Sequence, residues 1–460
     1  MLKRHEFETL YACLREEGAT LHRISAITGL PLETVVESID SLCSGGFMDA
    51  NRRLTENARV EIADYKVDSA IILATGAGTR FAPLSFERPK ALFEVRGEVL
   101  IERLIRQLCD VGINRIAVVA GYMKESLFYL EDKFGVSIVV NPDYASRNNH
   151  ASVWHARRYL GNTYIVSSDQ YFTENIFCSH RYGPCCTVVE SESSSAGFKV
   201  AMGHNDYVVG IERGGLGSLV MRGPVYFDSD ASRAYLNALE HEYDLPATKG
   251  KMWEEVLAEH LCDIPLSVDL VASDTVAEFR FLTDLVAFDT DFFANVDSGI
   301  LDNICKTLEC SREDISDVSP VKAGLTNLST LFSVRGEKYI YRHPGNGTNE
   351  LINRRAEAFA LGVAKELGLD DTFVYEEPEK GWKISRFIEG CSELDYADAG
   401  QVSRALELTR RLHESGRVSP FASTSRRRRI RSWRCSRGCA TACPVVSKSS
   451  MRGSPHCPTP

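Results

Sequence analysis

Two glycines, an arginine and a lysine follow an apolar segment near residue 70 and could together bind phosphate groups. Gly76 and Gly78 lack a β-carbon, so the backbone can approach a triphosphate closely and direct successive N–H groups at its oxygen atoms. Arg80 can bind phosphate in a bidentate manner, and Lys90 adds a compact positive charge. A glycine turn between a strand and a helix is common, but the Thr-Arg, Pro-Leu and Pro-Lys pairs that accompany it here favour a nucleoside triphosphate site.

The segments that must position these residues alternate between strand and helix patterns from residue 67 to residue 290. Short apolar runs typical of buried parallel strands occur at Ser69–Thr75, Arg115–Gly121, Ser137–Asn141 and Tyr164–Asp169. Between the first two runs, residues Val99–Val111 place their apolar side chains on one helical face. This repetition predicts an α/β fold with a mostly parallel, Rossmann-like sheet and a ligand site at its carboxyl edge.

The motif L-x-x-G-x-G-T-R-x-x-P-L-x(4)-P-K, which begins at Leu73, resembles the signature of the sugar-phosphate nucleotidyltransferase superfamily. Three further motifs are similar to those of the phosphocholine cytidylyltransferase branch: Gly121-Tyr122, Asn141-x-x-Tyr144 and Asn148-Asn149-x-x-Ser152. The resemblance covers residues 67 to about 290 and is most specific in the first part of that range. It implies transfer of CMP from CTP to phosphocholine, which gives CDP-choline and pyrophosphate.

The same resemblance assigns site residues by their match to the motif. Arg80 and Lys90 would be catalytic, because both would neutralise charge that develops on the attacked phosphorus and on the departing pyrophosphate. The implied nucleotide-binding residues are Leu73, Ala74, Gly76, Ala77, Gly78, Thr79, Arg80, Lys90 and Asn148.

A Mg²⁺ ion held by carboxylates is the cofactor that such a reaction normally needs. Asp169 ends the apolar run YIVSSD and is the expected first ligand, with a helix-capping role as its alternative. The resemblance implies a later acidic-x-acidic motif, and Glu278 matches its first position. Arg280 stands where the second acid is expected, which puts that part of the metal site in doubt.

Aromatic side chains would be needed to bind a quaternary ammonium acceptor, since that group offers no hydrogen-bond donor. Tyr171, Tyr226 and Trp253 are the candidates, with Glu254 as a counter-charge, although each aromatic residue could equally belong to the core. The sequence leaves open whether the acceptor is phosphocholine, phosphoethanolamine or a sugar phosphate.

Residues 1 to 64 are predicted to form a small helical module. The expected helices are Glu6–Glu17, Leu21–Thr28 and Leu32–Cys43. Their order resembles a winged helix-turn-helix. The third helix carries Glu33, Glu37 and Asp40 but no Lys or Arg, whereas a helix entering the major groove needs positive charge. Docking or self-association is therefore favoured over DNA binding.

Residues 300 to 420 are predicted to form an α+β lobe. A hairpin is expected at Leu328–Val334 and Lys338–His343, followed by a helix from Asn349 to Leu367. This segment resembles the N-lobe of choline kinases and aminoglycoside phosphotransferase-like enzymes. The resemblance implies a kinase-like ATP site formed by Gly324, Asn327, Arg342 and Glu357, the last two as an ion pair.

The catalytic-loop aspartate and metal-binding aspartate of such kinases do not follow in this sequence, so the lobe is expected to be incomplete and inactive. A choline kinase makes phosphocholine, which a phosphocholine cytidylyltransferase consumes. The two partial resemblances therefore agree on one pathway.

Charge is distributed unevenly over the 460 residues, whose net charge is -10. Residues 421 to 460 contain eight Arg and one Lys but no Asp or Glu, and they lack apolar periodicity. A frame-shifted or truncated reading is the favoured explanation, and a basic tail for an anionic partner is the alternative. The acidic remainder fits a small-molecule enzyme better than a nucleic-acid-binding protein.

A cytoplasmic protein is expected from two further features. The 14 cysteines show no paired C-x-x-C spacing, and no apolar run approaches the about 18 residues of a membrane span. Two rival functions remain: a sugar-1-phosphate nucleotidyltransferase, and a DNA-binding regulator with nucleotide-sensing domains. The sequence does not indicate base preference or oligomeric state.

Overall fold

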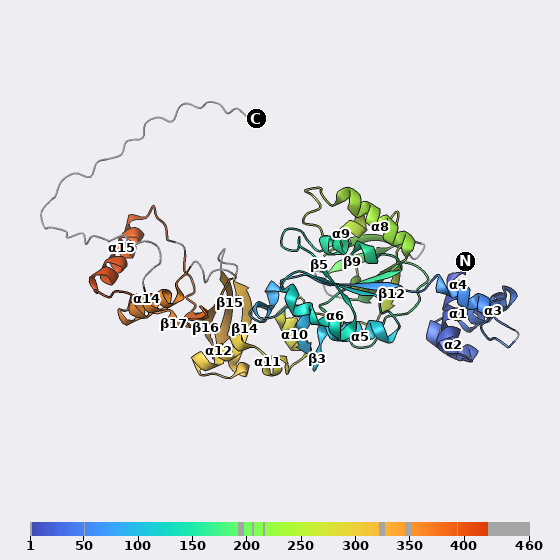
Figure 1. The fold of residues 1–460 in the computed structure, drawn as a ribbon, viewed down its shortest axis with the longest axis horizontal. Helices are drawn as coiled ribbons and strands as arrows, with labels where there is room; N and C mark the ends of the chain where they lie inside the picture. Colours follow the sequence, from blue (N-terminus) through green and yellow to red (C-terminus); the bar gives the residue numbers. More distant parts are fainter. Residues whose placement is uncertain are drawn as a thin grey trace, which may run out of the picture.

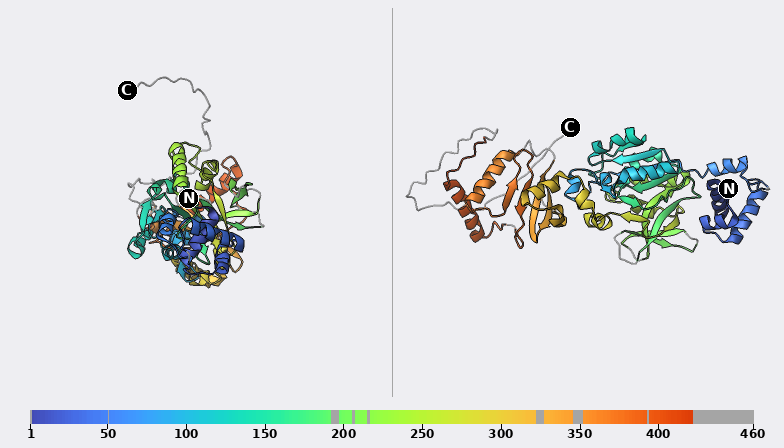
Figure 2. Two further views of the ribbon diagram at one scale, coloured as in Figure 1. Left: turned by 90° about the vertical axis from the view of Figure 1, so that its right-hand side faces the viewer. Right: turned by 90° about the horizontal axis from the view of Figure 1, so that it is seen from below.

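Three parts follow one another along the long axis of the computed structural model (Figures 1 and 2). The structure describes residues 2–49, 51–191, 197–204, 207–214, 217–321, 327–345, 352–392 and 394–421. The predicted tail after residue 421 and the predicted kinase-like residue Gly324 lie outside these ranges. In the described parts of the chain, no helix combines the length and apolar character needed to cross a bilayer.

The N-terminal part is a cluster of helices, shown in blue in Figure 1. Its elements are α1 (Arg4–Arg15), α2 (Leu21–Thr28), α3 (Leu32–Ser44) and α4 (Glu56–Ala63). Thr20 caps the start of α2 through its side chain, and Gly29 ends that helix with a left-handed φ of 72°. The acidic residues of α3, Glu33, Glu37 and Asp40, are exposed. The three predicted helices are present within two residues of their expected bounds.

The central part is built on a nine-stranded mixed sheet whose main order is β10-β9-β11-β6-β1-β4-β5, with β8 paired to β11 and β12 paired to β8. Its strands are β1 (Ser69–Ala74), β4 (Ile116–Ala120), β5 (Ser137–Val140), β6 (Thr163–Ser167), β8 (Cys185–Glu190), β9 (Phe198–Met202), β10 (Val208–Arg213), β11 (Leu219–Phe227) and β12 (Ser267–Val271). β6, β1, β4 and β5 are mutually parallel, whereas β11 runs antiparallel to β6, β8 and β9. The predicted α/β fold with a largely parallel sheet around the first strand is confirmed.

Helices cover both faces of this sheet. One apolar core contains buried residues of β1 and β4 together with Ile101 and Leu104 of α5 (Leu100–Asp110) and Leu130 of α6 (Tyr129–Phe134). The other core contains alternate residues of the same strands together with Tyr235 of α8 (Ser229–Glu242) and Val256 of α9 (Trp253–Glu259). Because both strand faces are covered, the strands are apolar throughout, which is the pattern that made them recognisable in the sequence.

Short elements between the main strands and helices complete this part. They are η1 (Thr79–Phe81), η2 (Leu84–Phe86), η3 (Lys90–Leu92), β2 (Glu94–Val95), β3 (Glu98–Val99), η4 (Lys124–Leu127), α7 (His150–His155), η5 (Arg157–Tyr159), β7 (Gln170–Phe172) and β13 (Val276–Glu278). β7 and β13 form a separate antiparallel pair in which Gln170 lies opposite Glu278.

The C-terminal part is a second sheet with helices. A five-stranded antiparallel sheet has the order β14-β15-β16-β18-β17. Its elements and those that lead into it are α10 (Leu282–Phe288), α11 (Phe292–Asn295), α12 (Gly299–Leu308), η6 (Arg312–Asp314), β14 (Ile315–Val321), β15 (Asn327–Val334), β16 (Glu337–Pro344), α14 (Arg354–Glu366), β17 (Phe373–Glu376), β18 (Lys383–Arg386) and α15 (Ala399–Glu414). The predicted hairpin is confirmed as β15 and β16.

A third apolar core joins the central and C-terminal parts. It contains Phe81 and Leu84 from the loop region after β1, and Tyr341 and Ile384 from the second sheet. The C-terminal sheet is therefore packed against the segment that carries the predicted phosphate-binding residues.

Candidate active site

The predicted phosphate loop lies at the carboxyl end of β1, between the parallel neighbours β4 and β6. Gly78 has a φ of 58°, a left-handed conformation that glycine adopts without strain. Gly76 is exposed, and a β-carbon placed on it would meet no heavy atom within 4 Å. The loop backbone thus faces open space at the position where a phosphate chain could approach it.

Lys90 is held beside the loop by three contacts. Its Nζ donates to Oδ2 of Asp169 at 2.5 Å and to the carbonyl oxygen of Phe279 at 3.0 Å, and it lies 4.6 Å from the centre of the Phe81 ring. Arg80 is exposed, and its guanidinium lies 5.1 Å from the centre of the Phe281 ring. The two predicted cations therefore differ: Lys90 is anchored, whereas Arg80 rests on an aromatic face at the cleft surface.

Asp169 and Glu278 are brought together by the pairing of β7 with β13. The backbone N–H of Phe279 also donates to the carbonyl oxygen of Asp169 at 3.3 Å. Burial alone would raise the pKa of Asp169, but the ammonium of Lys90 outweighs it, so this pKa lies below its usual range. The pKa of Glu278 is raised, first by burial and then by the negative charge of Asp169. The two carboxylates therefore face the same space.

The residues present fit a divalent cation. Oδ1 of Asp169 is buried and has no hydrogen-bond partner in the described part of the chain, and a second carboxylate is close enough to perturb it electrostatically. Hard oxygen ligands of this kind are those that Mg²⁺ prefers. Arg280 lines the same cleft, and its Nε pairs with Oε2 of Glu278 at 3.3 Å, so one oxygen of that carboxylate is already engaged.

These residues line a cleft of about 460 Å³. The predicted residues on its wall are Leu73, Gly78, Thr79, Arg80, Lys90, Asp169, Trp253 and Glu278. Ala74, Gly76 and Ala77 belong to the same strand end and loop, next to the lining residues. The expected counter-charge Glu254 and the motif residue Asn149 also line the cleft, together with Ser167, Arg213, Met252, Arg280 and Phe281.

Besides Ala74, Gly76 and Ala77, three further predicted residues of the central part do not line the cleft. Asn148 is exposed and its side-chain amide donates to the carbonyl oxygen of Gly250 at 2.9 Å, whereas the neighbouring Asn149 faces the cleft. Tyr226 is 1% exposed within the sheet core. Tyr171 is buried against Phe288, with ring centres 5.1 Å apart. Aromatic character in the sequence did not distinguish a cleft residue from a core residue.

Glu254, at the start of α9, is a third acidic residue of the cleft wall. Burial raises its pKa to about 8, with a further contribution from Glu278. Its Oε2 is buried and has no hydrogen-bond partner among the described residues. Asn149 fixes the helix start, because its Oδ1 accepts from the backbone N–H of Trp253 at 2.9 Å. Glu254 can therefore accept a hydrogen bond or receive a cation from the cleft.

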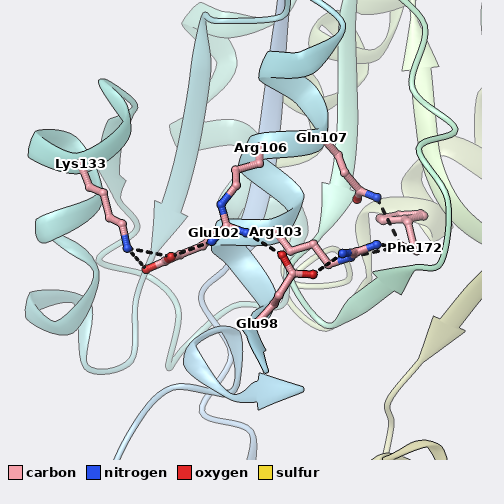
Figure 3. A network of polar contacts seen from close by, with 7 residues as sticks. All are labelled: Glu98, Glu102, Arg103, Arg106, Gln107, Lys133 and Phe172. Carbon is pink, nitrogen blue, oxygen red and sulfur yellow. Dashed lines mark hydrogen bonds and ion pairs between the residues drawn. The ribbon is translucent and has the colours of Figure 1, made fainter. Parts of the chain in front are cut away.

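A polar network holds β7, and with it Asp169, against α5 (Figure 3). Nη2 and Nε of Arg103 donate to the carbonyl oxygen of Phe172 at 2.9 and 3.2 Å, and Nε2 of Gln107 donates to the same oxygen at 3.3 Å. Glu98 pairs with Arg103 and with Arg106, and Glu102 pairs with Arg106 and Lys133. The carbonyl three residues after Asp169 is thus fixed by three donors.

In the C-terminal lobe, the predicted ion pair between Arg342 and Glu357 is present at 2.6 Å. Arg342 also pairs with Glu376 at 3.1 Å, and Arg354 pairs with Glu357 at 2.9 Å. The predicted Asn327 begins β15, but its side chain, like the whole of Gly324, lies outside the described residues.

Comparison with known proteins gives matches to the central part. The MobA-like NTP transferase domain family matches residues 70–180. The chain is 32% identical over 236 residues to 2-aminoethylphosphonate cytidylyltransferase of Lancefieldella rimae, which spans 50% of this chain and 96% of that protein. It is 27% identical over 215 residues to choline-phosphate cytidylyltransferase of Streptococcus pneumoniae, which spans 47% of this chain and 94% of that protein. The solved structure of CTP:phosphocholine cytidylyltransferase from Streptococcus pneumoniae aligns with a TM-score of 0.47 and 27% identity, covering 49% of this chain and 98% of that one.

Proposed function

The chain belongs to the cytidylyltransferase family of nucleotidyltransferases, and from this premise we propose that it transfers CMP from CTP to phosphocholine or to a related short amino-alkyl phosphate or phosphonate. The observation that carries the proposal is the cleft whose wall combines a phosphate loop, an anchored lysine, a pair of carboxylates and a third acidic group, Glu254.

In this reaction an acceptor oxygen attacks the α-phosphorus of CTP. A new P–O bond forms, the bond from the α-phosphorus to the bridging oxygen of the β-phosphate breaks, and pyrophosphate leaves with that electron pair. Backbone N–H groups of residues 76 to 79 would bind the triphosphate. Lys90 and Arg80 would neutralise the charge that builds up on the phosphate oxygens.

A Mg²⁺ ion bound by Asp169 and Glu278 would polarise the phosphate oxygens and reduce repulsion between nucleotide and acceptor. One oxygen of Asp169 is engaged by Lys90, and the other has no hydrogen-bond partner among the residues that the structure describes. The carboxylate therefore holds the lysine in place while its second oxygen remains available.

The cleft wall around Glu254 and Trp253 supports an acceptor with a cationic head group. Oε2 of Glu254 has no hydrogen-bond partner among the described residues, and Trp253 lies beside Glu254 but is only 4% exposed. Phosphocholine would need aromatic faces, yet Tyr171 and Tyr226 lie in the core. A primary ammonium would instead donate hydrogen bonds to Glu254. This observation favours 2-aminoethylphosphonate or phosphoethanolamine as a second candidate acceptor beside phosphocholine.

An acceptor screen tests the proposal. Pyrophosphate release from CTP is measured with phosphocholine, phosphoethanolamine, 2-aminoethylphosphonate and glucose 1-phosphate, and then with UTP, ATP and GTP in place of CTP. The proposal expects CTP-dependent turnover with at least one of the amino-alkyl acceptors. Turnover with glucose 1-phosphate alone would establish the rival sugar-1-phosphate reaction.

For the flanking parts, we propose that the C-terminal lobe is an incomplete choline-kinase-like lobe, supported by the Arg342–Glu357 ion pair on β16 and α14. The N-terminal helices are proposed to be a winged-helix-like docking module. Exposed acidic residues on α3 support docking over DNA binding, because they would repel a phosphate backbone. Salt-sensitive duplex binding by the full chain would reverse that assignment.

A further inference from the structure

The segment between Leu84 and Pro89 touches the C-terminal part of the chain through Phe86, Glu87 and Arg88, and Nη2 of Arg88 donates to Oδ2 of Asp297 at 2.7 Å. The Phe86 and His343 rings lie 5.7 Å apart. Glu87 accepts from the hydroxyl of Ser298 at 2.5 Å and from the backbone N–H of Ile300 at 3.1 Å. These residues fall inside the Pro-Leu-x(4)-Pro-Lys motif, at the positions that the motif leaves unspecified.

The contacts of Glu87 place its carboxylate at the N-terminus of α12. Ser298 is the N-cap of this helix and its hydroxyl oxygen also accepts from the N–H of Leu301 at 3.2 Å. A carboxylate at this end of a helix satisfies free N–H groups and interacts favourably with the helix dipole. A β-carbon on Gly299 would lie 3.3 Å from Oε1 of Glu87, so the approach is close. Glu87 thus serves as a capping group supplied from 211 residues away in the sequence.

The same segment packs against the phosphate loop on its other side. A β-carbon on Gly78 would lie 3.5 Å from the β-carbons of both Ser85 and Lys90. Phe81 and Leu84 share one apolar core with Tyr341 of β16, and β14 lies against η1. Any shift of the segment relative to α12 would therefore move Lys90 relative to the loop.

We propose that Glu87 is a positioning residue for CTP binding: by capping α12 it fixes the segment that carries Lys90, so that the C-terminal lobe helps to form the nucleotide site of the central part. Glu87 does not line the cleft itself and acts through Lys90. The inference rests on the proposed assignment of Lys90 to CTP.

The test measures the Kd for CTP by calorimetry on the full chain, together with KM for CTP and for the acceptor. Glu87→Ala and Ser298→Ala are compared singly and combined, with Ser311→Ala as the matched control. Ser311 lies in the same part of the chain and its hydroxyl donates to Asp314 at 3.1 Å. Both test variants are expected to raise the Kd and KM for CTP by about three- to tenfold, the range that loss of a helix cap corresponds to.

Three features of the expected result separate positioning from simple loss of folded protein. KM for the acceptor stays unchanged, the double variant is no worse than the worse single variant, and Ser311→Ala behaves as wild type. A variant that merely unfolds part of the sample would lower the maximal rate and leave both KM values alone. If Glu87→Ala is insoluble, Glu87→Gln replaces it and is expected to shift KM for CTP in the same direction.

Two results would overturn the inference. One is an effect of Glu87→Ala that Ser298→Ala does not reproduce, because the C-terminal lobe would then not be involved. The other is a Kd for CTP that is the same in every variant as in the wild type, when the wild type binds CTP. A wild type that binds no CTP overturns the proposed function and the inference together, so the two failures are distinguishable.

Discussion

The ammonium nitrogen of Lys90 lies 2.5 Å from Oδ2 of Asp169 although 79 residues separate them in the sequence. Lys90 comes from the motif after β1, and Asp169 follows β6, the parallel neighbour of β1. The pair is mostly buried, with side-chain exposures of 16% and 22%. In the ligand-free protein each charge is compensated by the other, and the negative charge of a bound triphosphate would compete with Asp169 for the lysine.

Replacement of Lys90 should impair catalysis far more than folding. Lys90→Ala is expected to lower kcat/KM for CTP by about 10²- to 10³-fold, because a charge aimed at the reacting phosphates is lost. The measurement is pyrophosphate release, with the exposed Lys380→Ala as a control of equal charge change. Equal turnover by the two variants would remove Lys90 from the nucleotide site.

The two loop glycines should separate stability from binding. Gly78→Ala places a side chain at a φ of 58° and is expected to cost about 1–2 kcal/mol of unfolding free energy. Gly76→Ala has open space around its β-carbon, so it should leave Tm unchanged while raising KM for CTP by obstructing the approach of phosphate. Tm and KM for CTP are measured for both variants. Equal losses of stability in Gly76→Ala and Gly78→Ala would contradict this prediction.

Glu254 should make acceptor binding depend on pH. Its pKa of about 8 means that the carboxyl is neutral at lower pH and becomes charged as the pH rises through 8. KM for a cationic acceptor is therefore expected to fall as pH increases from 6.5 to 8.5, and Glu254→Gln should flatten this dependence. A Glu254→Gln profile that parallels the wild type would show that another group controls it.

The raised pKa of Glu254 should also make the free energy of unfolding depend on pH. The folded protein retains a proton on Glu254 between its usual pKa of 4.5 and about 8, whereas the unfolded chain has released it. The contribution of Glu254 to stability without ligand thus declines as pH rises through this window. Denaturant unfolding at pH 5 and pH 8 should show a smaller decline for Glu254→Gln than for the wild type.

In the C-terminal lobe, removal of Arg342 should destabilise the fold. Arg342 pairs with Glu357 and with the fully buried side chain of Glu376, so Arg342→Ala leaves the buried carboxyl of Glu376 without this ion-pair partner. A loss of about 3 kcal/mol is expected by denaturant unfolding. The matched control is Arg355→Ala, whose pair with Glu379 is more than half exposed on both sides and should contribute about 0–1 kcal/mol. Similar losses in the two variants would contradict this account.

The sequence by itself determined the features that depend on residues close together along the chain. The strand at Ser69–Ala74 is recognisable because both its faces are buried, and Gly76 and Gly78 because they follow it in a phosphate-binding motif. The ion pair between Arg342 and Glu357 was implied by the resemblance of this lobe to choline kinases. Helix ends were predicted within a few residues for the same reason: caps and breakers act locally.

Only the tertiary structure decided which side chains reach the cleft. Tyr226 and Trp253 are both aromatic, yet β11 directs the first into the core while α9 brings the second to the cleft wall. Asn149 rather than Asn148 faces the site, and Glu254 and Arg213 join it from segments without a motif. The contact between Glu87 and Ser298 spans 211 residues. Such placements depend on the packing of elements that are distant along the chain, and local sequence patterns do not encode that packing.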